Sequence, residues 1–111
     1  MKFIAGEPHV LTDDGLRLPV AQAPRGSHGD RVLYGTRPED FVIDAGQGVP
    51  ADIVVVEPTG SETQVALRLG GHDVIAAFRE RIGARPGERL PLRPLPDKAH
   101  LFDAAGGQRL N

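Results

Sequence analysis

The sequence predicts an all-β domain whose short strands close, or nearly close, one barrel. Fourteen glycines and ten prolines are spread along 111 residues, which is typical of many short strands joined by tight turns. Several segments alternate apolar and polar residues, the period of a strand with one buried face. The core must be aliphatic, because the chain has four Phe, one Tyr and no Trp. A chain of this length fits a single domain, residues 1–111, with one core.

Turn residues separate the predicted strands. The segment 12–15 ends in Gly15, which supplies the positive φ of a hairpin turn. Pro19, Pro91 and Pro94 lack an N–H, so we expect their strands at sheet edges. Strands are expected at residues 3–4, 10–11, 16–20, 31–37, 51–57, 62–69, 74–79, 90–92 and 99–102.

The middle of the chain predicts a three-stranded meander. Residues 53–56 are Ile-Val-Val-Val, a β-branched run that favours a buried strand. Residues 62–69 alternate, with Val65 and two leucines on one face and polar residues on the other. Turns are expected at residues 58–61, 70–73 and 85–88.

Two segments are candidates for short helical turns. Residues 38–42 begin with Pro38, which suits the first helical position, and acidic residues follow it in the first turn. The other candidate is 80–84. Polar loops are expected at residues 22–30 and 44–50.

The chain contains a faint internal repeat. Gly29-Asp30-Arg31-Val32 resembles Gly87-Glu88-Arg89-Leu90, and the same offset of 58 residues relates Pro38-Glu39 to Pro96-Asp97. The halves lie roughly at residues 1–48 and 49–111. We therefore expect one barrel built from two similar halves, neither of which closes alone.

Composition and charge exclude several classes of function. Thirteen basic and fifteen acidic residues are interspersed, so no basic stripe indicates a nucleic-acid partner. The absence of cysteine excludes disulfides, thiolate chemistry and cysteine metal sites. No segment approaches the roughly 20 apolar residues of a membrane span, and the first residues do not form a signal peptide, so we expect no direct membrane insertion.

The sequence predicts no catalytic, cofactor-binding or metal-binding residue. It has neither a GxxxxGK[ST] phosphate loop nor a GxSxG nucleophile elbow. None of the four histidines forms the i, i+4 pair of a zinc hydrolase; they are His9, His28, His72 and His100. No nucleophile accompanies the acidic residues, which we interpret as turn and edge residues: Glu39, Asp40, Glu57, Glu62 and Asp97.

Arg37 is the most specific candidate for an interaction. It precedes a proline and should be extended, with its guanidinium held in a defined direction. The guanidinium fork suits a carboxylate such as Glu39, Glu57 or Glu62. Two roles are open: an ion pair across an interface, or a local structural clamp. Phe41, Phe78 and Phe102 are each interpreted either as core residues or as part of the apolar centre of an interface.

Four segments resemble the C-terminal domain in ATP-binding subunits of maltose-type ABC importers of sugars and glycerol phosphate. Their order and spacing agree with that family. Residues 35–39 are similar to its G-[IV]-R-P-E, residues 57–63 to its E-x-L-G-x-E-T, residues 100–103 to its H-L-F-D and residues 1–4 to its M-N-F-[IL]. Thr36 and Pro58 depart from the pattern, which leaves a strand boundary and the substrate class open.

The resemblance implies an OB-fold, also called a TOBE or MOP-like, β-barrel with an accessory, regulatory role. In that family two such domains contact each other and hold an ATPase dimer together. The implied partners are the chain's own ATPase domain, a second copy and, indirectly, the membrane subunits, at the cytoplasmic side of the inner membrane. ATP and Mg²⁺ would belong to an ATPase domain preceding Met1, so we expect an excised fragment or a stand-alone relative that is not itself an enzyme.

A second hypothesis is that the chain is a ligand-binding module of the same barrel class. The turn at residues 60–63 offers backbone donors that could hold an oxyanion in a nest, although such a segment is more often simply a hairpin. The ligand would then be an oxyanion or a small metabolite. A nucleic-acid-binding barrel is disfavoured, because the basic groove and stacking aromatics for single strands are missing.

Overall fold

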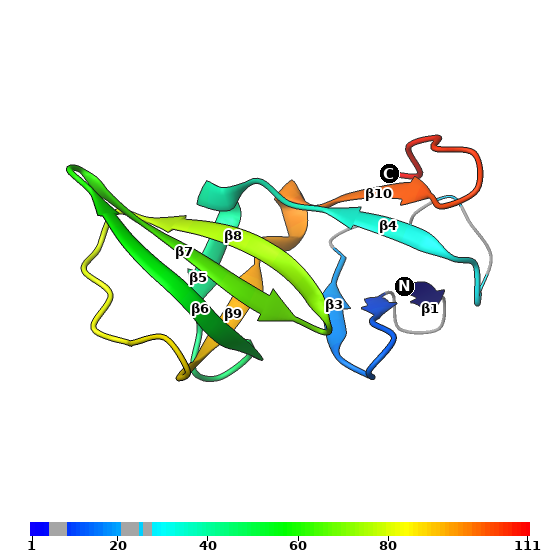
Figure 1. Cartoon of the computed structure of the whole chain (residues 1–111). Coiled ribbons are helices and arrows are strands. Elements are labelled where there is room, and N and C mark those ends of the chain that lie inside the picture. The colour runs from blue at the N-terminus through cyan, green and yellow to red at the C-terminus, as the bar shows by residue number, and fades with distance from the viewer. Residues whose placement is uncertain (5–8, 21–24, 26–27) are drawn as a thin grey trace. The chain divides into compact units, whose positions relative to one another are not determined.

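The computed structural model describes residues 1–4, 9–20, 25 and 28–111, and this part of the chain is all-β with two short 3-10 turns (Figure 1). The expected fold class is therefore confirmed. The elements are β1 (Lys2–Ile4), β2 (His9–Leu11), β3 (Arg17–Pro19), β4 (Val32–Gly35), η1 (Pro38–Asp40), β5 (Phe41–Ile43), β6 (Val49–Thr59), β7 (Glu62–Leu69), β8 (His72–Phe78), β9 (Arg89–Pro94), η2 (Pro96–Lys98) and β10 (His100–Asp103).

The order of elements repeats within the described residues. Four strands, a 3-10 turn and a fifth strand occur first as β1 to β5 and again as β6 to β10. The two turns begin at Pro38 and Pro96, which are separated by the offset that relates the two sequence halves. In both turns proline follows an extended residue and an acidic residue lies in the first turn. Two similar halves are thus visible in the fold, while their boundaries at 1–48 and 49–111 stay a prediction.

The two repeats exchange their last strands. β4 of the first repeat pairs with β10 of the second, and β5 of the first lies beside β9 of the second in the sheet β5-β9-β6-β7-β8. The chain accordingly divides into two compact units: unit 1 is Met1–Thr36 with Pro94–Asn111, and unit 2 is Arg37–Arg93. Each unit combines strands of one repeat with the final strand of the other.

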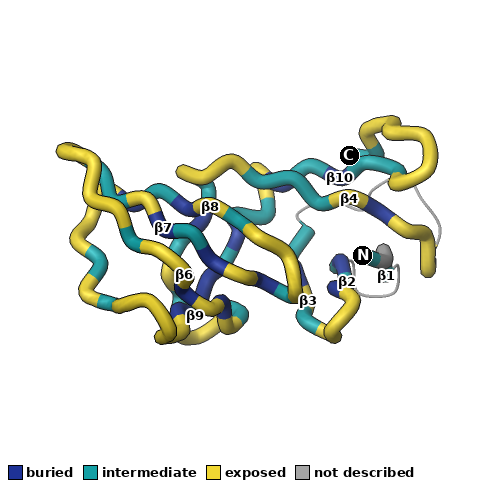
Figure 2. Tube along the Cα trace, in the orientation of Figure 1, coloured by how far each residue is buried: buried dark blue, intermediate teal, exposed yellow. Residues whose placement is uncertain are grey.

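The sheet of unit 2 buries one face. Along β7, Val65, Leu67 and Leu69 are buried while Gln64 and Arg68 are exposed, as the alternation predicts. Neighbouring strands add Ile53 opposite Leu67 and Ala76 opposite Val65. Figure 2 shows the same alternation of buried and exposed positions along β7. The predicted meander of β6, β7 and β8 is therefore present, and its inner face forms an aliphatic core with Phe41 and Phe78.

Unit 1 contains the sheet β1-β2-β3 and the two-stranded β4–β10 ribbon. Two hydrogen bonds join these parts: the Val32 N–H donates to Met1 O at 2.8 Å, and the Tyr34 hydroxyl donates to Pro19 O at 2.6 Å. Pro19 lies on β3, which is an edge strand as predicted. The core of this unit is small and aliphatic: Val10, Leu18, Val32, Ala99 and Leu101.

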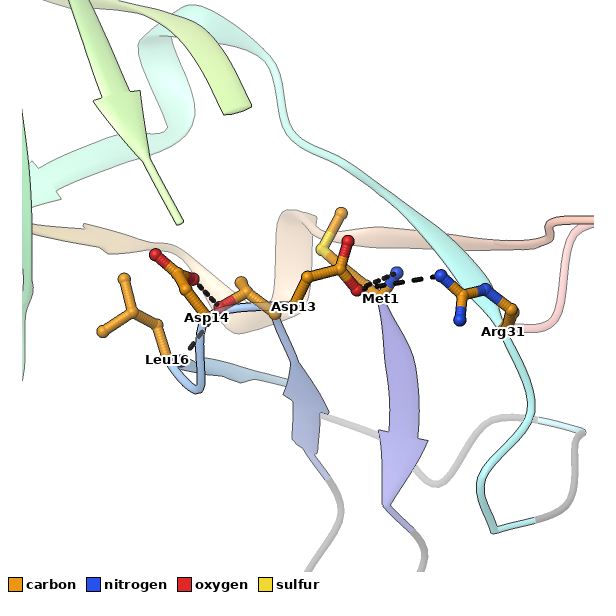
Figure 3. Close-up of polar contacts among 6 residues, drawn as sticks. Met1, Asp13, Asp14, Leu16 and Arg31 are labelled. Carbon is orange, nitrogen blue, oxygen red and sulfur yellow. Dashed lines mark hydrogen bonds and ion pairs between the residues drawn. The ribbon is translucent and has the colours of Figure 1, made fainter. Parts of the chain in front are cut away.

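The hairpin turn at residues 12–15 is confirmed. Gly15 has φ of 92°, and the buried Thr12 hydroxyl oxygen accepts the Leu16 N–H at 2.9 Å. The same hydroxyl donates to Asp14 Oδ1 at 2.7 Å (Figure 3). The buried Thr12 side chain thus provides the hydrogen-bond acceptor for a backbone N–H of this turn.

The expectation that Pro91 and Pro94 mark an edge strand is wrong, because β9 lies between β5 and β6. Pro91 is opposite Pro50 on β6. Opposed residues of an antiparallel pair exchange either two hydrogen bonds or none, so two facing prolines occupy a position where the ladder needs neither N–H. Pro94 ends the strand and is fully buried.

The predicted burial of residues 53–56 is also wrong in part. Val54 and Val55 are 48% and 42% exposed. A bulge between Ile53 and Val55 shifts the register, so Val55 faces solvent while Ile53 and Val56 pair with core residues of β7. The run of four β-branched residues therefore spans both faces of the sheet.

Three local predictions need correction. Residues 80–84 form no helix. A segment of five residues that contains Gly83 could form too few backbone hydrogen bonds to offset the cost of nucleating a helix. The helical turn expected at 38–42 stops at Asp40, and Pro96–Lys98 forms a turn that was not expected. The turn expected at 58–61 is shorter, because β6 continues to Thr59. Much of the loop expected at 22–30 lies outside the described residues.

Replacing Gly48 by alanine should destabilise unit 2. A Cβ there would lie 2.5 Å from both Asp44 O and the carbonyl carbon of Pro91, so backbone would have to move. We expect Gly48→Ala to lower the free energy of unfolding by about 1–3 kcal/mol, measured by urea denaturation. Gly83→Ala is the matched control, because nothing lies within 4 Å of its added Cβ. Equal stability of the two variants would contradict the close approach at Gly48.

Candidate functional site

The outer face of the β4–β10 ribbon is the clearest candidate for an interaction site. Residues of the two strands face each other in the pairs Leu33↔Phe102 and Gly35↔His100. The alternating residues Val32 and Leu101 are buried on the opposite face. We call the four residues Leu33, Gly35, His100 and Phe102 the ribbon face.

The ribbon face presents an apolar pair to solvent. Leu33 is 55% exposed, the largest value among the exposed large hydrophobic residues in the described part of the chain. Phe102 is half-buried, and its ring lies against Gly35, whose Cβ position is 3.5 Å from Phe102 Cε2. An exposed leucine beside an aromatic ring, on two strands held in register, is a rigid apolar surface.

Two buried polar atoms lie at the end of this ribbon. Thr36 Oγ1 and His100 Nδ1 have no hydrogen-bond partner among the described residues. Thr36 directly follows Gly35, the residue opposite His100. Thr36 is also where the sequence departs from the aliphatic residue of the resembled family.

Arg37 is exposed at the start of η1, with φ of −74° and ψ of 151°. The extended geometry expected before proline is therefore present. Within the described residues no carboxylate lies within 4 Å of its guanidinium, so no clamp to Glu39, Glu57 or Glu62 is formed. A role for Arg37 across an interface stays a prediction.

Glu39 and Glu62 come together in unit 2 at a hollow of about 750 Å³. Glu39 is in η1, and Glu62 begins β7 directly after the hairpin whose Gly60 has φ of 73°. Arg79 and Glu80 also line this hollow. The described residues contain no group of three metal-ligating side chains, so the hollow offers mixed charge and no metal set.

The sequence analysis named Phe102 as one of three phenylalanines that could contribute to an interface, but it did not name Leu33. Leu33 lies in a strand with ordinary alternation. Its importance comes from its position opposite Phe102, which is set by a pairing 69 residues apart. The described residues also include no helix with the length and apolar character needed to cross a membrane.

Comparison with known proteins gives one family. The model of the TOBE domain matches residues 34–102, which is more than half of the chain. The chain is similar to an uncharacterized ABC transporter ATP-binding protein of Sinorhizobium fredii, with 44% identity over 103 residues that cover 93% of this chain and 28% of that protein.

Two further relatives carry more specific descriptions. One is the sn-glycerol-3-phosphate import ATP-binding protein UgpC of Bordetella pertussis, 34% identical over 96% of this chain and 31% of that protein. The other is the sulfoquinovosyl glycerol transport ATP-binding protein SmoE of Agrobacterium fabrum, 36% identical over 82% of this chain and 27% of that protein. The chain thus spans less than a third of the length of these curated relatives.

The two faces of the ribbon should differ sharply in their contribution to stability. Leu101 is fully buried and Leu33 is 55% exposed, so the same substitution tests both. We expect Leu101→Ala to lower the free energy of unfolding by about 2–5 kcal/mol and Leu33→Ala by less than about 1 kcal/mol. Chemical denaturation measures both values. A large loss for Leu33→Ala would show that the ribbon face is core rather than surface.

Proposed function

Because this chain belongs to the TOBE domain family, we propose that it is an accessory, regulatory domain of an ABC importer's ATP-binding subunit. In this role it holds two copies of the subunit together while their ATPase parts open and close. Relatives described as ATP-binding proteins for glycerol phosphate and sulfoquinovosyl glycerol support an importer of carbohydrate or glycerol 3-phosphate. The proposed partners are an ATPase domain of the same polypeptide, a second copy and, indirectly, the membrane subunits of the transporter.

The single observation that carries this proposal is the apolar pair on the ribbon face, in which Leu33 is exposed and Phe102 is half-buried. An interface between two modest domains needs an apolar centre with a polar surround. The ribbon face supplies such a centre on two paired strands that cannot shift independently. Its small extent fits a contact of limited area, at the weak end of specific interfaces.

ATP hydrolysis is not assigned to the described residues. Chemistry on ATP would need a phosphate loop and carboxylates for Mg²⁺, and neither the sequence nor the described side chains provide such a set. ATP and Mg²⁺ therefore belong, in this proposal, to the ATPase part of the subunit. The contribution of this chain is to position that part.

Charging the ribbon face should weaken self-association. We expect the wild-type chain to form a dimer in a concentration-dependent way, and the double variant Leu33→Asp, Phe102→Asp to raise the dimer Kd about tenfold or more. Sedimentation equilibrium from micromolar to millimolar concentration measures both constants. Val54→Asp is the matched control, because Val54 is also an exposed apolar residue but lies on β6.

The dimer proposal fails if the wild-type chain is strictly monomeric at millimolar concentration. It also fails if Val54→Asp weakens association as much as the double variant does. In that second case the contact would lie elsewhere than the ribbon face.

Arg37 provides a second, finer test. If it contributes to the interface, Arg37→Gln should raise the dimer Kd about two- to fivefold and leave the melting temperature unchanged. Thermal unfolding of the variant at low concentration separates the two effects. A stability loss above about 1 kcal/mol with an unchanged Kd would instead show that Arg37 contributes to folding and not to the interface.

A further inference from the structure

Three arginines from separate segments line one surface hollow in unit 1. The hollow has a volume of about 790 Å³ and includes Arg25, Arg31 and Arg109. Asp30, Asp103 and the Gln108 amide also line it. We call it the arginine hollow. It shares no residue with the ribbon face, although Arg109 pairs with Phe102 in an isolated β-bridge.

The backbone holds two of these arginines together. The Arg25 N–H donates to Leu110 O at 2.8 Å, and Arg25 Nη2 donates to Arg109 O at 3.3 Å. The Leu110 N–H in turn donates to Leu101 O at 2.8 Å, which ties the C-terminal segment to β10. Arg109 therefore has a defined position beside Arg25, although the two residues are distant in sequence.

Arg31 completes the set from the start of β4. Its carbonyl oxygen accepts the Ala104 N–H at 3.2 Å, which fixes its backbone against the residue that follows β10. Its guanidinium lies 3.8 Å from Asp13 Oδ1, and the N-terminal ammonium lies 3.8 Å from the same atom (Figure 3). The side chains of Arg31 and Asp13 are both largely exposed, and an exposed ion pair of that length stabilises a protein only weakly. The Arg31 guanidinium is therefore available to a better anion.

The charges of the hollow favour an anion. Three arginines and two aspartates line the hollow, and Asp103 Oδ2 already accepts the Gly106 N–H at 3.0 Å. Among the described residues, neither Arg25 nor Arg109 has a carboxylate within 4 Å. Several guanidinium groups lining one hollow suit the several oxygens of a phosphate better than the two of a carboxylate.

We propose that the arginine hollow binds a small phosphomonoester. The arginines hold the phosphate oxygens through charge-assisted hydrogen bonds. Ala104, Ala105 and Leu110 form an apolar side of the same hollow, against which the organic part of the ligand lies. This apolar side distinguishes an ester from an inorganic anion of the same charge.

The test is a calorimetric and NMR titration of the whole chain at low ionic strength. The probes are sn-glycerol 3-phosphate and glucose 6-phosphate, with inorganic phosphate, sulfate and glycerol as comparisons at matched ionic strength. We expect saturable binding of the esters with Kd of about 1 mM or tighter, weaker binding of the inorganic anions, and none of glycerol. The affected amides should be those of residues 25, 31 and 104–110.

Matched variants decide whether the arginines are responsible. Arg31→Gln combined with Arg109→Gln should weaken ester binding at least tenfold, and Arg25→Gln alone provides a second variant if that pair impairs folding. Arg89→Gln is the control, because Arg89 is similarly exposed but lies in unit 2 beside Asp52. Arg31→Lys should restore only part of the affinity, because lysine lacks the planar fork.

Several results would overturn the proposal. Absence of saturable ester binding by the wild-type chain would do so, as would equal weakening in the Arg89→Gln control. If inorganic phosphate or sulfate bound as tightly as the esters, the ligand would be an inorganic oxyanion and the phosphomonoester assignment would be wrong.

Discussion

The antiparallel pairing of β4 with β10 is the constraint on which both candidate sites depend. It sets Leu33 opposite Phe102, and it holds residue 104 against Arg31. The segment after β10 then returns to hydrogen-bond with Leu101 and Arg25. The ribbon face and the arginine hollow both combine residues from the two ends of the chain, so neither exists before this strand pair forms.

Local features of the fold were predictable because short-range geometry sets them. Gly15 allows the positive φ of its hairpin, Pro38 starts a turn, and the alternation in 62–69 gives the buried face of β7. The predictions that were wrong depend on how a strand pairs with a distant part of the chain. Pro91 is tolerated inside a sheet because the Pro50–Pro91 pair occupies a position where the β6–β9 ladder needs neither N–H, and the exposure of Val55 follows from a bulge that composition does not reveal.

The candidate sites were predictable only in part. Phe102 could be named from the sequence as a phenylalanine available to an interface, whereas Leu33 needed the register of a distant strand. Glu39 and Glu62 do share a hollow, but Arg37 does not line it. The three arginines of the arginine hollow could not be recognised from the sequence, because acidic and basic residues are interspersed along it and these three are brought together only by folding.

The exchange of last strands also imposes an order on biosynthesis. Unit 2 is one continuous segment, Arg37–Arg93, and all its strands are synthesised before β10. Unit 1 must wait for Pro94–Asn111, and until then β4 has an unpaired edge. An open edge strand is a template for pairing with another chain. Vectorial folding therefore leaves the edge of β4 open to aggregation until β10 has been synthesised.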